Sequence, residues 1–304
     1  MTPCGACGSP LGAPTLSSPD RLHGVPGTFE VARCPACGSG RTLPVVPEAG
    51  LGAFYPGAYA PHGDTDAGLA TVASRAIRRW QAGRMLASPA LSAARDRSPG
   101  RALDVGCGRG DLGAVLLDRG WSVDGVEPSP DAVAAARERG VQAREGTLGS
   151  VELELGAYEL VTFVHSLEHT VEPVEDLRRA AAAARPGATV AITVPNFGGA
   201  QAQRFGSCWF HLDVPRHRHH FTATGLRRAL EAAGLEVQRT ATSTSAVGLA
   251  GSIQYAASGR WVLRDGLGFR LTAAAFQATW PVARAYDLLA RRGGDLLHAV
   301  ARRP

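Results

Sequence analysis

The stretch HLDVPRHRHHF at residues 211–221 places four histidines and two arginines within eleven positions. Imidazoles in such a cluster can bind a metal, act as bases or line a substrate pocket. An exposed nucleic-acid patch would need basic and aromatic residues spread over a surface. Asp213, Pro215 and the neighbouring hydrophobic residues 208–210 instead predict a folded loop. Two interpretations stay open at this point: a wall of a substrate pocket, or a scaffold whose histidines bond to nearby carbonyl groups.

A second group of reactive residues lies at the N-terminus, where two matched C-x-x-C pairs are separated by 26 residues. Four thiolates suit a tetrahedral structural zinc. The spacer is rich in proline and glycine and too poor in apolar residues to fold unaided, so a metal would hold it together. A redox dithiol is the alternative, but the duplicated spacing favours zinc. The predicted ligands of this closed, non-catalytic site are Cys4, Cys7, Cys34 and Cys37.

Composition narrows the classes of chemistry. The chain has 304 residues, 45% of them hydrophobic, which is enough for one large domain or two ordinary ones. It contains no lysine, which excludes Schiff-base and P-loop mechanisms. The segment after residue 245 contains eight arginines and three aspartates, and this excess equals the whole net charge of +5. Residues 1–245 therefore carry no net positive charge that would indicate a nucleic-acid surface. A signal peptide and a long apolar run are both lacking, and we expect a cytoplasmic protein.

The elements that follow are organised around a glycine-rich loop. A short apolar strand at 102–105 runs into a loop with glycine at every second position, and a second apolar strand ends at Glu127, 19 residues past Gly108. Glycines let a ligand approach the amides of a helix N-terminus, and the distant carboxylate can hold ribose hydroxyls. Asp104 would repel a diphosphate but suits a ligand with an ammonium and a sulfonium. The predicted cofactor-binding residues here are Asp104, Gly106, Gly108, Gly110 and Glu127.

From Arg101 to about Thr240 the chain resembles the class I S-adenosylmethionine-dependent methyltransferases, whose first motif is this glycine loop and whose second is the acid at Glu127. Later blocks resemble, in order, the fourth strand with its tip, the fifth strand and the helix before the sixth: 158–169, 186–196 and 220–226. The resemblance implies an α/β fold, a Rossmann-like seven-stranded, mostly parallel sheet with helices on both faces, and S-adenosylmethionine as cofactor. A dinucleotide-type fold without this activity is the alternative.

The resemblance also implies contacts around the cofactor. Family members commonly carry an acid near the adenine after the third strand, whereas this chain has threonine there. We therefore expect Thr147 and Leu148 to contact the adenine, and His165 and Ser166 to approach the cofactor from the tip of the fourth strand.

In an open parallel sheet, ligands bind outside the carboxyl ends of the strands, so the tips after strands four and five should face the methyl acceptor. A subgroup of the family carries a Leu-Asp-x-Pro-Arg-His-x-x-His-Phe block like residues 212–221, and this favours the substrate-wall interpretation. Imidazole titrates near neutrality, which makes His169 and His217 the candidate bases. The remaining predictions are Glu168, His165 and His220 as catalytic residues, and Tyr59, Asn196, Trp209, Arg216 and His217 as substrate contacts.

A second metal is also conceivable at the tip of strand four. The methyltransferases of ubiquinone biosynthesis carry Glu-x-x-Glu-His there, implicated in binding a divalent cation, and this chain has His165, Glu168 and His169 at the matching positions. Two imidazoles and a carboxylate could hold a transition metal. In the alternative, Glu168 and His169 merely cap the helix that begins near Glu172.

We divide the chain into a zinc-binding module (1–45), a linker with an N-terminal helix at 64–94 (46–98), and a methyltransferase domain (99–304). Before the last strand, residues 246–295 are predicted to form a helical insertion. It has three interpretations: a helix pair or homodimer contact, an apolar lid, or a peripheral membrane contact through 250–290.

The function expected is methylation of a small, lipophilic molecule of a kind typical of secondary metabolism, with oxygen favoured over carbon. Carbon stays open because the sugar C-methyltransferases also join a four-cysteine module to this domain, although they have a further C-terminal domain. An RNA-modifying methyltransferase is the rival from another class. The few basic residues between Met1 and Arg41 argue against it.

Overall fold

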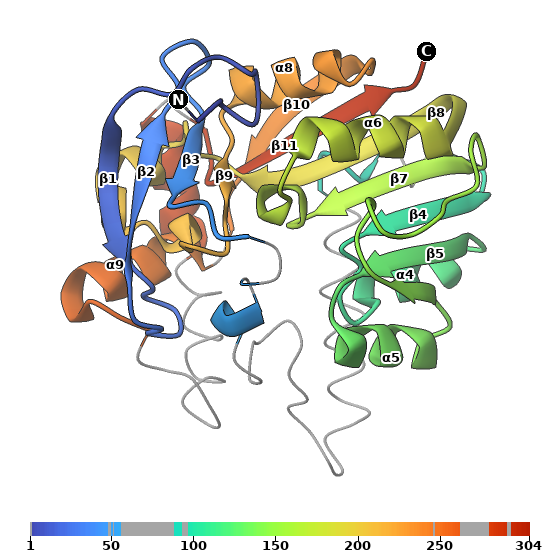
Figure 1. Cartoon of the computed structure of the whole chain (residues 1–304), viewed down its shortest axis with the longest axis horizontal. Coiled ribbons are helices and arrows are strands. Elements are labelled where there is room, and N and C mark those ends of the chain that lie inside the picture. Colours follow the sequence, from blue (N-terminus) through green and yellow to red (C-terminus); the bar gives the residue numbers. More distant parts are fainter. Residues whose placement is uncertain are drawn as a thin grey trace.

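The structure is a computed structural model of the chain, and the residues it describes are 2–47, 50, 52–55, 88–92, 97–245, 247–261, 280–290 and 293–304. They form two sheets that lie side by side (Figure 1). Two predictions concern residues outside these ranges. Tyr59 is not among the described residues, and of the helix predicted at 64–94 only residues 88–92 are described.

The larger sheet has seven strands in the order β10-β11-β8-β7-β4-β5-β6 and confirms the predicted fold. Every neighbouring pair is parallel except those of β11, which runs antiparallel to both β8 and β10. The chain moves outward from β4 in one direction to β6 and in the other to β8, so the sheet reverses its order beside β4. Ligands of such sheets bind at this reversal. The strands are β4 (Arg101–Val105), β5 (Ser122–Glu127), β6 (Gln142–Glu145), β7 (Tyr158–Val164), β8 (Ala184–Pro195), β10 (Glu236–Ser243) and β11 (Leu296–Arg302).

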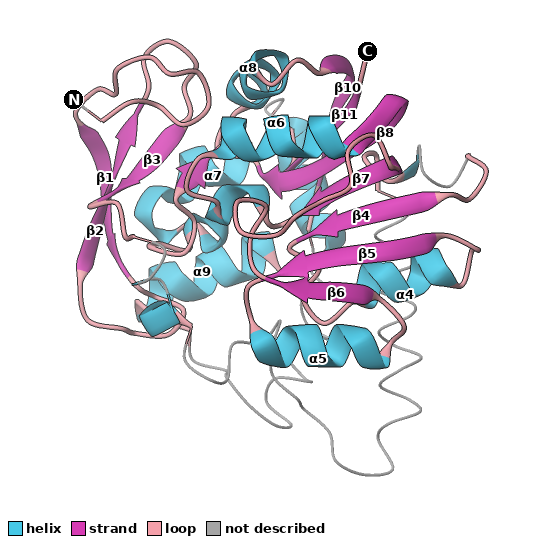
Figure 2. Cartoon of the chain, turned by 45° about the vertical axis from the view of Figure 1, so that its right-hand side comes forward, coloured by secondary structure: helices cyan, strands magenta, loops and turns pink. Residues whose placement is uncertain are grey.

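Helices cover both faces of this sheet (Figure 2). Alternate strand residues point to opposite faces. Ala102 and Leu160 pack with helices α4 and α5. Leu103 and Val161 pack on the other face, with α6 and α8. The four helices are α4 (Asp111–Leu117), α5 (Pro130–Glu138), α6 (Pro173–Ala183) and α8 (Ala223–Ala232).

The smaller sheet is antiparallel and belongs to the cysteine module, except for one strand. Its order is β1-β2-β3-β9, and the histidine-rich stretch supplies the last of these. Phe29 and Val31 pack in one cluster with Phe197 and Trp209, so the module shares a hydrophobic core with the domain. This shared sheet was not foreseen from the sequence. Its strands are β1 (Pro14–Pro19), β2 (Thr28–Arg33), β3 (Gly40–Leu43) and β9 (His219–His220).

The predicted insertion contains helix α9 at Gly248–Ser258 and helical residues at 280–289, whereas its described residues 259–261 and 293–295 are not helical. A Cβ at Gly251 would lie 2.4 Å from the Phe210 ring, so α9 packs tightly on the residues that precede the histidine-rich stretch. Within the described ranges, no helix has both the length and the apolar character needed to cross a membrane.

Candidate functional site

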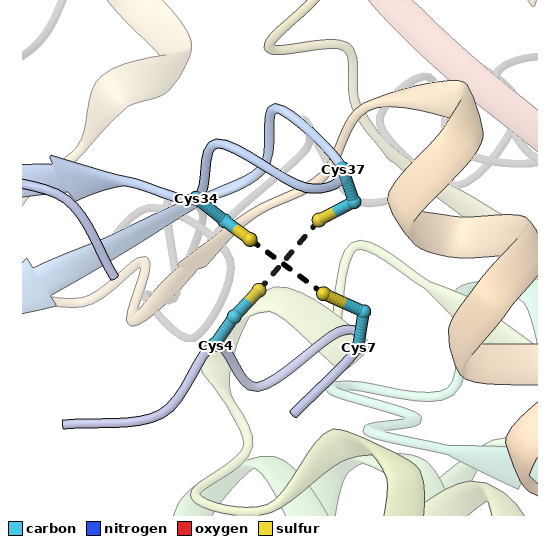
Figure 3. A group of neighbouring side chains, drawn as sticks. All are labelled: Cys4, Cys7, Cys34 and Cys37. Carbon is cyan, nitrogen blue, oxygen red and sulfur yellow. Dashed lines mark hydrogen bonds between the residues drawn. The ribbon is translucent and has the colours of Figure 1, made fainter. Parts of the chain in front are cut away.

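The four predicted metal ligands come together (Figure 3), with their side chains pointing toward one centre. Cys4 Sγ lies 3.7 Å from Cys37 Sγ, and Cys7 Sγ lies 3.6 Å from Cys34 Sγ. A disulfide bond is about 2.05 Å long, so these are not disulfides. Four sulfurs placed about 2.3 Å from one zinc ion would lie ~3.8 Å apart. The donor set therefore fits a tetrahedral zinc.

The glycine loop lies where β4 ends and α4 begins. Gly106, Gly108 and Gly110 all have positive φ, a conformation that glycine adopts without steric cost. A Cβ at Gly106 would lie 2.4 Å from Ser166 Cβ, whereas a Cβ at Gly108 would meet nothing within 4 Å. The loop is thus packed on one side and open above Gly108, which leaves its backbone accessible to a ligand.

Two buried carboxylates flank this loop. Thr162 Oγ1 donates to Asp104 Oδ1 at 2.6 Å. Glu127 accepts from the backbone N–H groups of Gly108 at 3.1 Å and Ser129 at 3.0 Å. Burial, reinforced by the charge of Glu127, raises the pKa of Asp104 to about 6 despite the Thr162 hydrogen bond. Burial raises the pKa of Glu127 as well. A bound cation would stabilise the ionised forms of both buried carboxylates, as a cofactor with an ammonium and a sulfonium would do.

The other predicted cofactor residues lie at neighbouring strand ends. Ser166 Oγ donates to Val105 O at 2.6 Å, and the backbone N–H of Thr147 donates to Ser150 Oγ. Leu148 is buried in the hydrophobic core with only 5% of its surface exposed. His165 follows β7 with φ of 55° and keeps 41% of its side chain exposed. These placements are compatible with the predicted contacts, which stay predictions.

A polar cluster lies beyond β7, where Glu168, His169 and His217 place one ligand atom each within 4.8 Å of one another. Glu168 is fully buried, and neither carboxylate oxygen has a hydrogen-bond partner among the described residues. The nearest imidazole nitrogens are His165 Nδ1 at 3.5 Å and His217 Nε2 at 4.0 Å. The two imidazoles at 169 and 217 meet edge to face, 4.6 Å apart.

Hydrogen-bond partners assign the tautomers of these imidazoles. His169 Nδ1 lies 3.1 Å from Arg216 O, and His217 Nδ1 lies 2.9 Å from His211 O. A carbonyl oxygen only accepts, so in both rings Nδ1 carries the proton and Nε2 carries the lone pair. His217 Nε2, which lies 4.0 Å from the Glu168 carboxylate, is therefore an acceptor and does not donate to it. A cation or an additional proton would complete such a group.

The electrostatics agree with neutral imidazoles. Burial, with a contribution from His217, lowers the pKa of His169 to about 4, and burial also lowers the pKa of His217. Burial alone would raise the pKa of Glu168, but His165, His217 and His169 bring it down to about 2. At neutral pH the cluster consists of a carboxylate and two neutral rings, which are weaker bases than an unperturbed imidazole.

The second metal stays a prediction, but the structure groups different residues from those expected for it. Glu168 and His169 lie with His217, from the histidine-rich stretch. His165 contacts Glu168 at 3.5 Å but is not part of this group of three. The capping alternative is wrong, because Glu172 is the N-cap of α6 and no side chain caps that helix end.

Several predicted substrate residues are held in structural contacts. Arg216 is fully buried, and its guanidinium donates to Asp20, Asp213 and Phe54 O. Asn196 donates to Gly294 O. These contacts favour the scaffold interpretation for the two residues, in place of the predicted role as substrate contacts. The buried Trp209 and His220 lie against Phe197, at ring centroid distances of 6.3 and 5.3 Å.

Four further residues touch the site without having been predicted as part of it. Tyr55 had been assigned only to the linker, yet its hydroxyl lies 3.0 Å from His169 Nδ1. Thr162 bonds Asp104. Asp20 and Thr42 reach the histidine-rich stretch from the cysteine module. No local pattern in the sequence pointed to these four contacts.

Comparisons with known proteins agree with this geometry. A family model described as a methyltransferase domain matches residues 73–240, more than half of the chain. A protein of Methylobacterium sp. (strain 4-46) named ubiquinone biosynthesis O-methyltransferase is 32% identical over 174 residues, which are 52% of this chain and 65% of that protein. A protein of the same name from Aeromonas salmonicida (strain A449) is 31% identical over 151 residues, 45% of this chain and 63% of that protein. The chain thus spans less than two thirds of the length of these relatives.

Among solved structures, that of the cyclase SpnF matches with a TM-score of 0.50 and 22% sequence identity, covering 80% of this chain and 84% of that one. At this identity the match supports the fold alone.

Proposed function

Since the chain belongs to the methyltransferase-domain family, we propose that it transfers the methyl group of S-adenosylmethionine to a hydroxyl of a small, lipophilic acceptor of the phenol or catechol class. One observation carries the proposal. The acidic, open glycine loop follows β4, and Glu168 and His169 follow the adjacent parallel strand β7, at the same edge of the sheet, where His217 joins them from the segment after β8. A site for a cationic cofactor thus adjoins a group of proton acceptors.

The bound cofactor supplies an electrophilic methyl group on a sulfonium. Asp104 and Glu127 would hold its charged and ribose portions, and Gly108, which has no side chain, would leave room for it beside the loop. In the transfer, the methyl carbon–sulfur bond breaks while a carbon–oxygen bond to the acceptor forms, and the acceptor hydroxyl gives up its proton. Nε2 of His169 or His217 takes that proton, with Glu168 stabilising the resulting imidazolium. Alignment and exclusion of water supply the rest of the acceleration.

Two metal roles belong to the proposal. The four cysteines hold a structural zinc with no open coordination position. The second role is an alternative to the histidine base: a divalent cation held by Glu168, His169 and His217 would occupy the ring lone pairs and would itself lower the pKa of a bound hydroxyl. Metal analysis tests both roles. We expect one zinc in the purified chain; a second ion that is lost in Glu168→Gln but retained in His165→Gln would establish the metal alternative, and its absence would leave the histidine base.

The relatives named for ubiquinone biosynthesis support oxygen as the acceptor atom and a lipophilic acceptor, whereas the expectation of secondary metabolism gains no support from them. Exposed apolar side chains at Ile253, Val282 and Leu289 agree with an apolar partner for the insertion. Whether that partner is the acceptor, a membrane surface or a second chain stays a prediction.

The test combines cofactor binding with transfer of labelled methyl. Calorimetry should show one S-adenosylhomocysteine bound per chain. A catechol probe, 3,4-dihydroxybenzoate with an alkyl substituent, should gain label on oxygen, located by mass spectrometry. Label on ring carbon would instead establish the alternative, C-methylation. Tight binding of NADH with none of the nucleoside would refute the proposal.

A further inference from the structure

The cysteine module contacts the histidine-rich stretch through the backbone of a shared sheet. In the β3–β9 pair, Gly40 lies opposite His220 and Arg41 opposite His219. The next residue of the module, Thr42, places its Oγ1 2.7 Å from His217 O and 2.9 Å from His220 Nε2. Because a carbonyl only accepts, the Thr42 hydroxyl donates to His217 O and accepts from His220 Nε2–H. One module hydroxyl therefore determines the His220 tautomer and anchors the peptide group of His217.

A second contact anchors the peptide group next to it. The buried Asp20 carboxylate, at the end of β1, bonds the Arg216 guanidinium through both oxygens, at 2.6 and 3.1 Å. The backbone oxygen of that arginine is the partner of His169 Nδ1. The module thus reaches both imidazoles of the cluster, His169 through Arg216 and His217 through its own carbonyl.

The cysteine loops themselves rest on the same segment. A Cβ at Gly5, between the first two cysteines, would lie 2.3 Å from the His219 ring, so this loop is in direct contact with the imidazole. His219 Nε2 lies 3.2 Å from Val171 O, two residues past His169. From the second cysteine pair, Cys37 O accepts from Thr222 Oγ1 at 2.7 Å. The segment 216–222 is therefore bounded on one side by the metal-binding loops.

From these contacts we propose that the cysteine module is a positioning element of the acceptor site: its zinc-bound fold holds the His169 and His217 rings in their places beside Glu168. The proposal rests on the proposed function for its catalytic consequence, but its structural claim is independent of the acceptor. Zinc at the four cysteines would then act on turnover without contacting the reactants. A displacement of about 1 Å in such a group can cost on the order of a hundredfold in rate.

The first test removes the metal from the full chain with a chelator and follows the imidazole ¹⁵N resonances by NMR. We expect the tautomer-specific shifts of His169, His217 and His220 to be lost in the metal-free chain, and amide exchange of residues 211–222 to accelerate. Binding of S-adenosylhomocysteine, measured by calorimetry, should change less than about threefold. Unchanged ring resonances would overturn the proposal. So would simultaneous loss of nucleoside binding, because the metal would then hold the whole chain together.

The second test keeps the zinc and changes one hydroxyl. Thr42→Val removes the hydrogen bonds to His217 and His220 at nearly constant shape, and Thr42→Ser restores them. We expect the valine variant to lose about tenfold in kcat on the alkylated dihydroxybenzoate probe, with altered His220 ring resonances and unchanged zinc content. The serine variant should recover both. Thr15→Val, which removes another hydroxyl of the module that bonds Val31 O, is the matched control.

Equal turnover and equal ring spectra in the valine and serine variants would refute the positioning role. The ring spectra need no acceptor, so they separate this proposal from the proposed function. If the nucleoside does not bind but the rings still respond to Thr42, the positioning claim stands and the methyltransferase claim fails.

Discussion

The cofactor half of the site (residues 101–146) and the acceptor half (165–169 with 209–222) are built in different ways. In the cofactor half, Glu127 contacts Gly108 within one strand–helix–strand unit, 19 residues away. In the acceptor half, Arg216 contacts Asp20 across 196 positions, and Thr42 contacts His217 across 175. The Glu127 contact of the cofactor half is thus local in the chain, whereas the acceptor half includes contacts that the cysteine module supplies.

This difference predicts where the two halves are sensitive. Substitutions in the cofactor half should not destabilise the fold strongly but should weaken cofactor binding, because these side chains face the ligand. Side chains that join the module to the acceptor half should affect folding strongly, because they are buried and charged.

The largest effect is expected from Asp20→Ala. The Arg216 guanidinium is fully buried and bonds two carboxylates, Asp20 and Asp213. Removal of Asp20 leaves the positive charge paired with Asp213, but the guanidinium N–H groups that bonded Asp20 lose their partner in the interior. Leaving buried donors of a charged group unpaired costs about 3 kcal/mol or more in the free energy of unfolding. Urea unfolding at neutral pH measures it.

The control is Asp111→Ala in the cofactor half, where the carboxylate is 42% exposed and pairs with Arg139 at 3.6 Å. Such an exposed pair should contribute less than about 1 kcal/mol. Similar losses in the two variants would contradict the distinction between the halves.

A smaller effect of opposite sign is expected from Asp104→Asn. The pKa of Asp104 is raised to about 6 from 3.8 by burial, so the folded state prefers the protonated form. The favourable contribution is full below pH 3.8 and is lost as the pH rises through 6. At pH 8 the ionised wild-type carboxylate should therefore cost about 2–3 kcal/mol relative to asparagine. Asparagine keeps an acceptor for the Thr162 hydroxyl.

The measurement is urea unfolding of both proteins without ligand at pH 4 and pH 8. The variant should gain stability over wild type only at the higher pH. It should also bind S-adenosylhomocysteine at least about tenfold more weakly, since the ammonium loses its counter-charge. If both proteins show the same pH dependence, burial does not hold Asp104 at a raised pKa.

The same division explains what could be predicted from the sequence. The strand at 102–105, the glycine loop and Glu127 were predicted because periodicity and spacing record local geometry. The four cysteines were predicted because each pair lies on one turn. The contacts of Asp20, Thr42 and Tyr55 could not be predicted, because no local pattern marks a partner more than a hundred residues away. For the same reason Arg216 was expected to contact substrate, although it anchors the cysteine module.

The smallest loss of stability is expected from substituting the N-cap residues of two helices, one in each half of the site. In both, a side-chain hydroxyl accepts a hydrogen bond from a backbone N–H. Ser129 caps α5 by accepting from Ala132 N–H at 3.4 Å. Thr222 caps α8 by accepting from Gly225 N–H at 3.1 Å, and it also donates to Cys37 O at 2.7 Å. Loss of an N-cap costs about 0.5–2 kcal/mol. We expect Ser129→Ala near the lower limit and Thr222→Ala near the upper, because only the latter also leaves a module carbonyl unpaired.

Competition for zinc with a chromophoric chelator separates the two contributions of Thr222. If its hydroxyl serves only the helix, Thr222→Ala should release zinc at the same chelator concentration as Ser129→Ala. If it also supports the cysteine loop, zinc should leave at a several-fold lower concentration, and Thr222→Ser should return to the wild-type value. The second outcome is expected, because the carbonyl of a predicted metal ligand is the partner of that hydroxyl, and a looser loop binds the metal more weakly.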